Sequence, residues 1–183
     1  MIITITGKPC SGKGTVSKIF CEKYNFEYLC TGDMFRNLAK SYGYTNVLDF
    51  QKDERVKEAD NIIDTQTENI GKEKLNEDLL IDSRLAWHFI PKSFKVFIDV
   101  DWNTAGKRLL EANRASEKVN NLSTAIEKLK DRWQEENSRY MLLYKTNNLN
   151  TDKYNFVISS SNKTPEEIAD AIYNEYKKFM LSK

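Results

Sequence analysis

The chain has 183 residues, of which 28 are basic and 27 acidic, so its formal net charge is +1. This balance lacks the basic surplus typical of nucleic-acid-binding proteins, and no apolar run approaches the roughly 20 residues that a membrane-spanning helix needs. The three cysteines have no metal-ligand spacing, and Met1 leads directly into an apolar segment rather than a secretory signal. We therefore expect one cytoplasmic α/β domain with no nucleic-acid or membrane partner.

A phosphate-binding loop is indicated near the start of the sequence. Residues 1–6 are mostly β-branched, as in a buried parallel strand, and residues 7–15 read GKPCSGKGT, with the spacing G-x-x-x-x-G-K. Glycines let successive backbone N–H groups converge on phosphate oxygens, and the following helix directs its positive end at the same anion. A glycine-rich turn that binds nothing is the alternative, but the flanking strand and helix patterns favour the phosphate loop. The expected phosphate-binding residues are Gly7, Lys8, Pro9, Cys10, Ser11, Gly12, Lys13, Gly14 and Thr15.

The rest of the sequence alternates between strand and helix patterns. Apolar residues at helical spacing predict a helix over 12–24, and a short strand over 26–30 follows. Thr31-Gly32-Asp33 is expected to cap the next helix, which Gly43 ends, and residues 46–71 predict a small helical insertion. Further strands are predicted at 79–82, 94–100 and 154–159, and further helices at 102–113, at 123–143 and after the Thr164 cap. This alternation predicts a parallel sheet covered by helices on both faces.

Polar residues follow two of the predicted strands, at the edge of the sheet where ligands bind. Arg36 lies one turn into the helix after the second strand, where its guanidinium suits a second phosphate. Asp82 ends the third strand, as does the carboxylate with which P-loop enzymes approach Mg²⁺, and Arg84 follows it. A surface arginine and a simple helix cap are the bland alternatives for Arg36 and Asp82.

Arginines in the second half of the chain have the spacing of a cationic helix face. Arg132 and Arg139 are seven residues apart and therefore lie on one face of a helix, and Arg108 and Arg114 precede them. Nearby glutamates also fit a solvated face, although phosphoryl transfer needs several cations around the moving group. The single histidine, His88, has no predicted acid–base or metal partner, so we assign it a structural role.

In this order, the motifs resemble those of the nucleoside monophosphate kinases. The stretches GKPCSGKGT and TGDMFR, the strand ending in Asp82-Ser83-Arg84 and the late pair Arg132 and Arg139-Tyr140 are similar to the short cytidylate kinases over essentially the whole chain. The resemblance implies a P-loop kinase with a five-stranded parallel sheet. It also implies a core of residues 1–40, 75–112 and 132–183, a nucleoside monophosphate (NMP)-binding insertion at about 41–74 and a lid at about 113–131.

The resemblance further implies ATP-dependent phosphoryl transfer to CMP or dCMP by a monomer. The loop residues and Arg108 would bind ATP with Mg²⁺, Asp82 would approach the metal through water, and the catalytic cations would be Lys13, Arg132 and Arg139. The residues implied to bind the acceptor are Gly32, Asp33, Arg36, Asp64, Gln66 and Arg84.

Two positions depart from the family pattern, and two other functions remain open. Ser83 replaces the glycine usual before this arginine, and Leu85 stands where many cytidylate kinases carry an aspartate that reads the base. The resemblance therefore covers phosphate binding more fully than base recognition. The alternatives are a P-loop kinase for another small acceptor, such as another NMP, a sugar or a shikimate-like acid, and a nucleotide-binding regulator that does not catalyse transfer.

Overall fold

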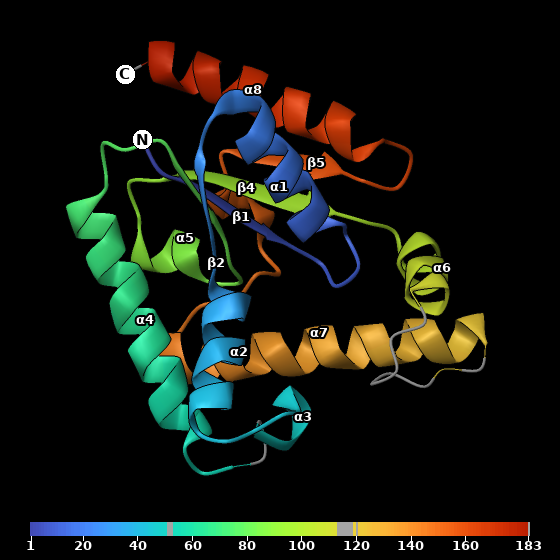
Figure 1. Cartoon of the computed structure of the whole chain (residues 1–183). Coiled ribbons are helices and arrows are strands. Elements are labelled where there is room, and N and C mark those ends of the chain that lie inside the picture. The colour runs from blue at the N-terminus through green and yellow to red at the C-terminus, as the bar shows by residue number, and fades with distance from the viewer. Residues whose placement is uncertain (51–52, 113–118, 120, 183) are drawn as a thin grey trace.

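A five-stranded, all-parallel sheet organises the chain (Figure 1). The computed structural model describes residues 1–50, 53–112, 119 and 121–182. The strand order is β2-β3-β1-β4-β5, which places the first strand at the centre. The strands are β1 (Ile3–Gly7), β2 (Glu27–Cys30), β3 (Leu79–Asp82), β4 (Phe94–Asp99) and β5 (Phe156–Ser159). The predicted five-stranded parallel sheet is confirmed.

Helices connect the strands and cover both faces of the sheet. The described helices are α1 (Lys13–Tyr24), α2 (Thr31–Ser41), α3 (Val47–Phe50), α4 (Val56–Glu73), α5 (Ala86–Phe89), α6 (Trp102–Glu111), α7 (Leu122–Tyr144) and α8 (Pro165–Leu181), with a 3-10 turn at Thr151–Lys153. Helix α5 has no counterpart among the predicted elements, because one turn is too short to display helical periodicity. No described helix is long and apolar enough to cross a membrane.

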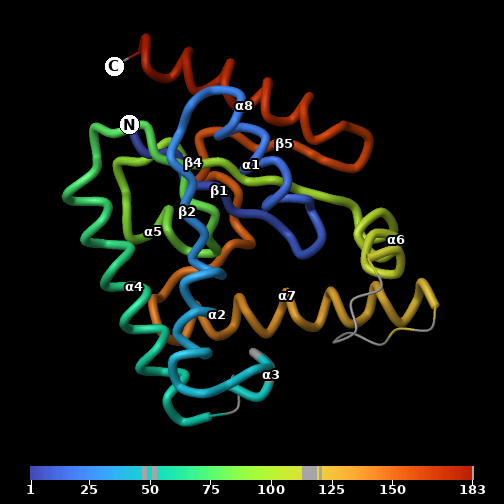
Figure 2. The backbone as a smooth tube through the Cα atoms, in the orientation of Figure 1, coloured from blue at the N-terminus to red at the C-terminus, as the bar shows by residue number. Residues whose placement is uncertain are grey.

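The core has one layer on each side of the sheet. Ile3 and Ile5 of β1 pack with Phe20 of α1 and Ile172 of α8, so that the first and last helices lie side by side on one face (Figure 2). Thr6, the residue after Ile5, points to the opposite face, where its hydroxyl donates to the Ser83 carbonyl at 2.9 Å. This hydrogen bond joins the end of β1 to the segment that follows β3, so the loop after β1 and that segment lie at the same edge of the sheet.

Residues of the predicted insertion form helices α3 and α4, which lie against α2 (Figure 1). Ala39, Phe50 and Ala59 make a small buried cluster there. At the far end of α4, Gly71 lies so close to Ile90 that a Cβ on the glycine would overlap the isoleucine side chain. The close approach fixes α4 against the segment that follows α5.

Two sequence predictions differ from the structure or fall partly outside it. The cap at Thr31-Gly32-Asp33 is wrong: α2 begins at Thr31 directly after β2, with Cys30 at the N-cap position and no side-chain cap bond. The strand therefore runs into the helix without a capping turn. Within the predicted lid, residues 113–118, including Arg114, and residue 120 lie outside the described residues, whereas 122–131 belong to α7.

Substituting Thr164 tests the capping box of α8. The Thr164 hydroxyl accepts from the Glu167 N–H at 3.2 Å, and the Glu167 carboxylate accepts from the Thr164 N–H at 2.7 Å. We expect Thr164→Ala to lower the free energy of unfolding by about 1 kcal/mol, because the cap bond is lost. Thr164→Ser keeps the hydroxyl and is the matched control in urea unfolding. Equal stability of the two variants would contradict the assignment.

Candidate active site

The phosphate loop between β1 and α1 is held open by its backbone geometry. Gly7 lies so close to β4 that a Cβ on it would overlap the Ile98 carbonyl, and the Lys8 N–H donates to that carbonyl at 3.2 Å. Cys10 and Gly12 both have left-handed backbones, with φ of 58° and 80°. Left-handed residues on either side of Ser11 turn successive N–H groups toward one point, as anion binding requires.

Two cations predicted to bind ATP brace the loop. Arg108 donates to the Cys10 carbonyl at 3.1 Å and to the Ser160 carbonyl at 2.7 Å, so it ties the loop to the segment after β5. The Lys8 ammonium pairs with Asp99 at 2.7 Å and lies over the Trp102 ring. Neither side chain lines the cleft in front of the loop.

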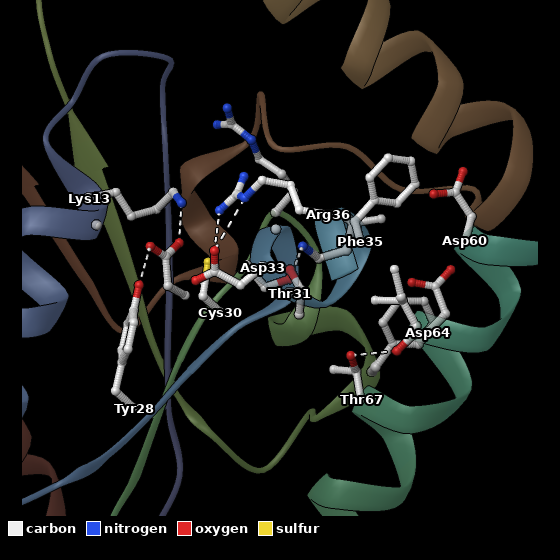
Figure 3. Close-up of a pocket in the computed structure, with 18 of the residues that line it drawn as sticks. Lys13, Tyr28, Cys30, Thr31, Asp33, Phe35, Arg36, Asp60, Asp64 and Thr67 are labelled. Carbon is white, nitrogen blue, oxygen red and sulfur yellow. Dashed lines mark hydrogen bonds and ion pairs between the residues drawn. The ribbon is translucent and has the colours of Figure 1, made fainter. Parts of the chain in front are cut away.

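The Lys13 side chain lies on the same side of the site as Tyr28 (Figure 3), and its ammonium forms an ion pair with Asp82. The Lys13 ammonium donates to Asp82 Oδ1, and the Tyr28 hydroxyl donates to Asp82 Oδ2 at 3.4 Å. Asp82 is the last residue of β3, and its buried side chain lies beside Gly14 in the first turn of α1. A buried carboxylate of this kind needs a cation or hydrogen-bond donors beside it, and Lys13 and Tyr28 supply both.

The same carboxylate could hold Mg²⁺ together with nucleotide phosphates. Asp82 is a hard oxygen donor, and Thr15 lines the cleft beside it. No group of three histidine, cysteine, aspartate or glutamate residues among those the structure describes could hold a metal ion alone. This donor set fits Mg²⁺, which commonly uses one or two carboxylates and completes its octahedron with phosphate and water.

Arg36 projects into the cleft from α2 (Figure 3). Its Nη2 and Nε donate to Asp33 Oδ1 at 2.6 and 3.2 Å, and Gly32 lies beside the guanidinium. Hydrogen bonding to Arg36 lowers the pKa of the Asp33 carboxyl below its usual range. The two residues are three apart in one helix, and both side chains are exposed. Asp33 therefore serves mainly to orient the guanidinium.

Glu136 joins two of the predicted arginines. Its Oε2 pairs with Arg84 Nε at 3.3 Å, and its Oε1 accepts from Arg132 Nε at 3.1 Å. The Arg84 guanidinium also donates to the Gly7 carbonyl, so this arginine contacts the phosphate loop directly. Sequence reasoning assigned Glu136 to a solvated face, although its i,i+4 spacing from Arg132 was a signal for the pair.

Helix α7 also contacts the insertion. Arg139 lies 3.5 Å from Asp60 of α4, and the Tyr144 hydroxyl donates to Asp64 one turn further along. Burial is the largest influence on both carboxyls and raises the pKa of Asp60 and of Asp64 above the usual value. These contacts fix the insertion relative to the arginine-bearing helix.

Together these elements enclose a cleft of about 700 Å³. Of the residues predicted for the site, the structure brings the following to its walls: Lys13, Gly14, Thr15, Gly32, Asp33, Arg36, Asp64, Asp82, Arg84, Arg132 and Arg139. Gln66 is exposed and does not line the cleft. Thr67, which no sequence argument selected, does line it, and its i,i+3 spacing from Asp64 was the available signal. The walls also include Phe35 of the TGDMFR motif and Leu85, together with apolar side chains that the motifs did not indicate: Ile19, Ile63, Phe89 and Leu143.

Comparison with known proteins agrees with this geometry. Residues 6–124 match the family described as an AAA domain. The chain is 33% identical over 164 residues to a cytidylate kinase of Methanococcus aeolicus, with 88% of this chain and 89% of the relative covered. The chain belongs to the cytidylate kinase-like P-loop kinases. Shikimate kinase from Bacteroides thetaiotaomicron shares the fold of this kinase, with a TM-score of 0.67, 13% identity and 98% of both chains covered.

Another relative is a longer protein. The kinase is 34% identical over 178 residues to an S-adenosylmethionine-dependent nucleotide dehydratase of Lacinutrix mariniflava. The match covers 96% of the kinase but only 36% of that relative. The chain thus spans about a third of the dehydratase and most of the length of the cytidylate kinase.

Substituting Asp64 tests the effect of its burial on stability. Asp60, Arg139 and Tyr144 face its carboxyl, and the net effect is a raised pKa. The charged form therefore destabilises the folded state above that pKa, whereas below the ordinary value of 3.8 both states are neutral. We expect Asp64→Asn to raise the free energy of unfolding at pH 7, with a difference that shrinks as the pH falls toward about 4.

The measurement is urea unfolding of wild type and variant across this pH range. Asp152→Asn, which removes an exposed carboxylate, is the matched control and should give little change. A variant less stable than wild type at pH 7 would mean that Arg139 and Tyr144 stabilise the Asp64 charge by more than burial costs.

Proposed function

We propose that this kinase transfers the γ-phosphoryl group of ATP to a nucleoside monophosphate, with CMP or dCMP as the acceptor. The observation that carries the proposal is the convergence of Lys13, Arg36, Arg84, Arg132 and Arg139 on one cleft. Several cations around a cavity of this kind suit two phosphate-bearing substrates and the charge that passes between them. The cytidylate kinase relatives, and a relative named for a nucleotide reaction, support a nucleotide acceptor.

In this proposal the donor lies at the phosphate loop. The loop N–H groups and the N-terminus of α1 hold the β- and γ-phosphates, and the Lys13 ammonium moves from Asp82 onto their oxygens. Asp82, released from Lys13, would help to hold Mg²⁺, which would supply charge neutralisation to the phosphates. Arg108 keeps the loop in shape through the Cys10 carbonyl.

The acceptor lies between α2, α4 and α7. Arg36 and Arg84 bind its phosphate, because a planar guanidinium matches two phosphate oxygens at once. Arg132 and Arg139 stabilise the transferring group, whose charge is spread over its equatorial oxygens. No side-chain base is needed, since positioning and charge neutralisation supply most of the catalysis.

An acceptor screen tests the proposal. ATP, Mg²⁺ and one candidate acceptor at a time are incubated with the kinase, and ADP release is coupled to a spectroscopic readout. CMP, dCMP, UMP, AMP and GMP cover the nucleotides, and shikimate covers the acceptor of a structural neighbour. We expect turnover with CMP or dCMP. Turnover with shikimate alone, or with none of these acceptors, would overturn the proposal.

Removing the Lys13 ammonium should abolish most of the transfer. We expect Lys13→Ala to lower kcat by about 10²-fold or more, because a cation that stabilises the transition state is lost. Lys23→Ala is the matched control, since Lys23 lies at the other end of α1 and pairs with Asp170 on the surface. Circular dichroism verifies folding, and near-normal turnover by folded Lys13→Ala would refute the role of the loop.

Arg132 and Arg139 should act on the transferring group rather than on acceptor affinity. We expect Arg132→Ala and Arg139→Ala each to lower kcat by a larger factor than they raise the acceptor KM. Lys130→Ala on the same helix is the control, because Lys130 is exposed and does not line the cleft. Unchanged kcat in both arginine variants would mean that these residues belong to a solvated helix face and take no part in phosphoryl transfer.

A further inference from the structure

Two polar side chains of α4 face the cleft from adjacent turns. Asp64 and Thr67 are three residues apart and lie side by side on the cleft wall (Figure 3). Ile63, Phe35 and Tyr144 line the same cleft, so apolar and aromatic side chains accompany the polar pair. The charged pair of Asp60 and Arg139 also lies there and acts on the Asp64 carboxyl. Such a surface suits the flat face and polar edge of a nucleobase.

The hydrogen-bonding direction of Thr67 is fixed by its own helix. Its hydroxyl donates to the Ile63 carbonyl at 2.7 Å, and the side chain is buried. The single hydroxyl proton is therefore committed to the backbone. Toward the cleft, the oxygen offers only its lone pairs, so Thr67 can accept a hydrogen bond from a ligand but cannot donate one.

The same restriction applies to Asp64. One of its oxygens accepts the proton of the Tyr144 hydroxyl, so the carboxylate already acts as an acceptor, while burial, the larger influence, raises the pKa of this carboxyl above its usual value. An ionised carboxylate has no proton to give. Asp64 and Thr67 therefore both present hydrogen-bond acceptors to the cleft, and neither presents a donor.

We infer that Asp64 and Thr67 read the exocyclic amine of the acceptor base. The inference rests on the proposed function and adds the means of selection. An amine carries two N–H donors, one for each acceptor, as on C4 of cytosine. Uracil has a carbonyl oxygen at that position, whose lone pairs would face those of Asp64 and Thr67 without a proton between them. The wild-type kinase should therefore prefer CMP to UMP strongly, because a polar site rejects an analogue that leaves its groups unpaired.

The exposed Gln66 differs from this pair in chemistry as well as in position. Its amide has both donors and acceptors and could match either pyrimidine. Residue 66 points away from the cleft that residues 64 and 67 face, because α4 is a continuous helix from Val56 to Glu73. Selection by α4 therefore depends on acceptors alone.

The experiment compares kcat/KM for CMP and UMP in the wild type and in Thr67→Val. Valine keeps the shape of the β-branched side chain and removes the acceptor oxygen. We expect the CMP value to fall about 10-fold and the ratio of CMP to UMP to fall by at least as much, since the clash with the uracil carbonyl is also relieved. Thr67→Ser retains the hydroxyl and should keep most of the ratio. Thr65→Val makes the same change at an exposed position of α4 and should keep the wild-type ratio.

An unchanged ratio in Thr67→Val, or an equal loss in Thr65→Val, would overturn the inference. If Thr67→Val does not fold, Asp64→Asn provides the test, because its amide can donate to the uracil carbonyl and should raise kcat/KM for UMP relative to CMP. An unchanged ratio in that variant would also overturn it.

Equilibrium binding separates this inference from the proposed function. Calorimetric titration of wild type and Thr67→Val with CMP and UMP needs no turnover. If no acceptor is phosphorylated but wild type binds CMP about 10-fold or more tightly than UMP and Thr67→Val loses the difference, the proposed reaction fails and the amine reading stands. If CMP is phosphorylated but Thr67→Val keeps the wild-type preference, the reaction stands and the amine reading fails.

Discussion

The compensation of positive charge within the cleft is the constraint on which the rest of the site depends. Lys13 pairs with Asp82, Arg36 with Asp33, and Arg139 with Asp60. In the first and last of these pairs the two side chains come from different elements. Several cations in a partly buried space repel one another, and without carboxylates they would destabilise the fold. Phosphate oxygens can take over these pairings, so the interactions that stabilise the cleft occupy the positions that substrates would use. The acids keep the cations aimed and close together.

The division of labour among the elements explains why relatives with this fold can act on different substrates. The sheet, the phosphate loop and α1 handle the part common to all such kinases, the phosphates of the nucleotide donor. Helices α2 and α4 supply the surface against which an acceptor would rest. Helix α2 meets the core at β3, and α4 meets it at α5, through the Gly71 contact, and at α7, through the pair of Arg139 and Asp60. Shikimate kinase shares the fold of this chain at 13% identity. This similarity concerns the scaffold alone, and the choice of acceptor depends on the residues of the insertion.

The sequence was most informative where function depends on contiguous residues and least where it depends on distant ones. The loop at residues 7–15 is a local pattern, so both its position and its shape were predictable. The resemblance implied that Gln66 binds the acceptor together with Asp64, whereas a helix brings together residues three or four apart and therefore presents Thr67 beside Asp64. The contact of Arg84 with Glu136 joins residues 52 positions apart on different elements, and no spacing rule predicts such a pair. Helix α5 escaped prediction because it is only one turn long.

The left-handed backbone of Cys10 has a consequence for the thermodynamics of nucleotide binding. A residue other than glycine in this conformation carries strain on the order of 1 kcal/mol, and the contact of Arg108 with its carbonyl helps to maintain it. The loop thus acquires its curvature when the chain folds, before any nucleotide arrives. Its conformational entropy is lost at that stage, so an incoming phosphate meets N–H groups that are already convergent. The affinity of the loop for an anion is not reduced by the cost of ordering it, and the strain lowers the stability of the protein instead.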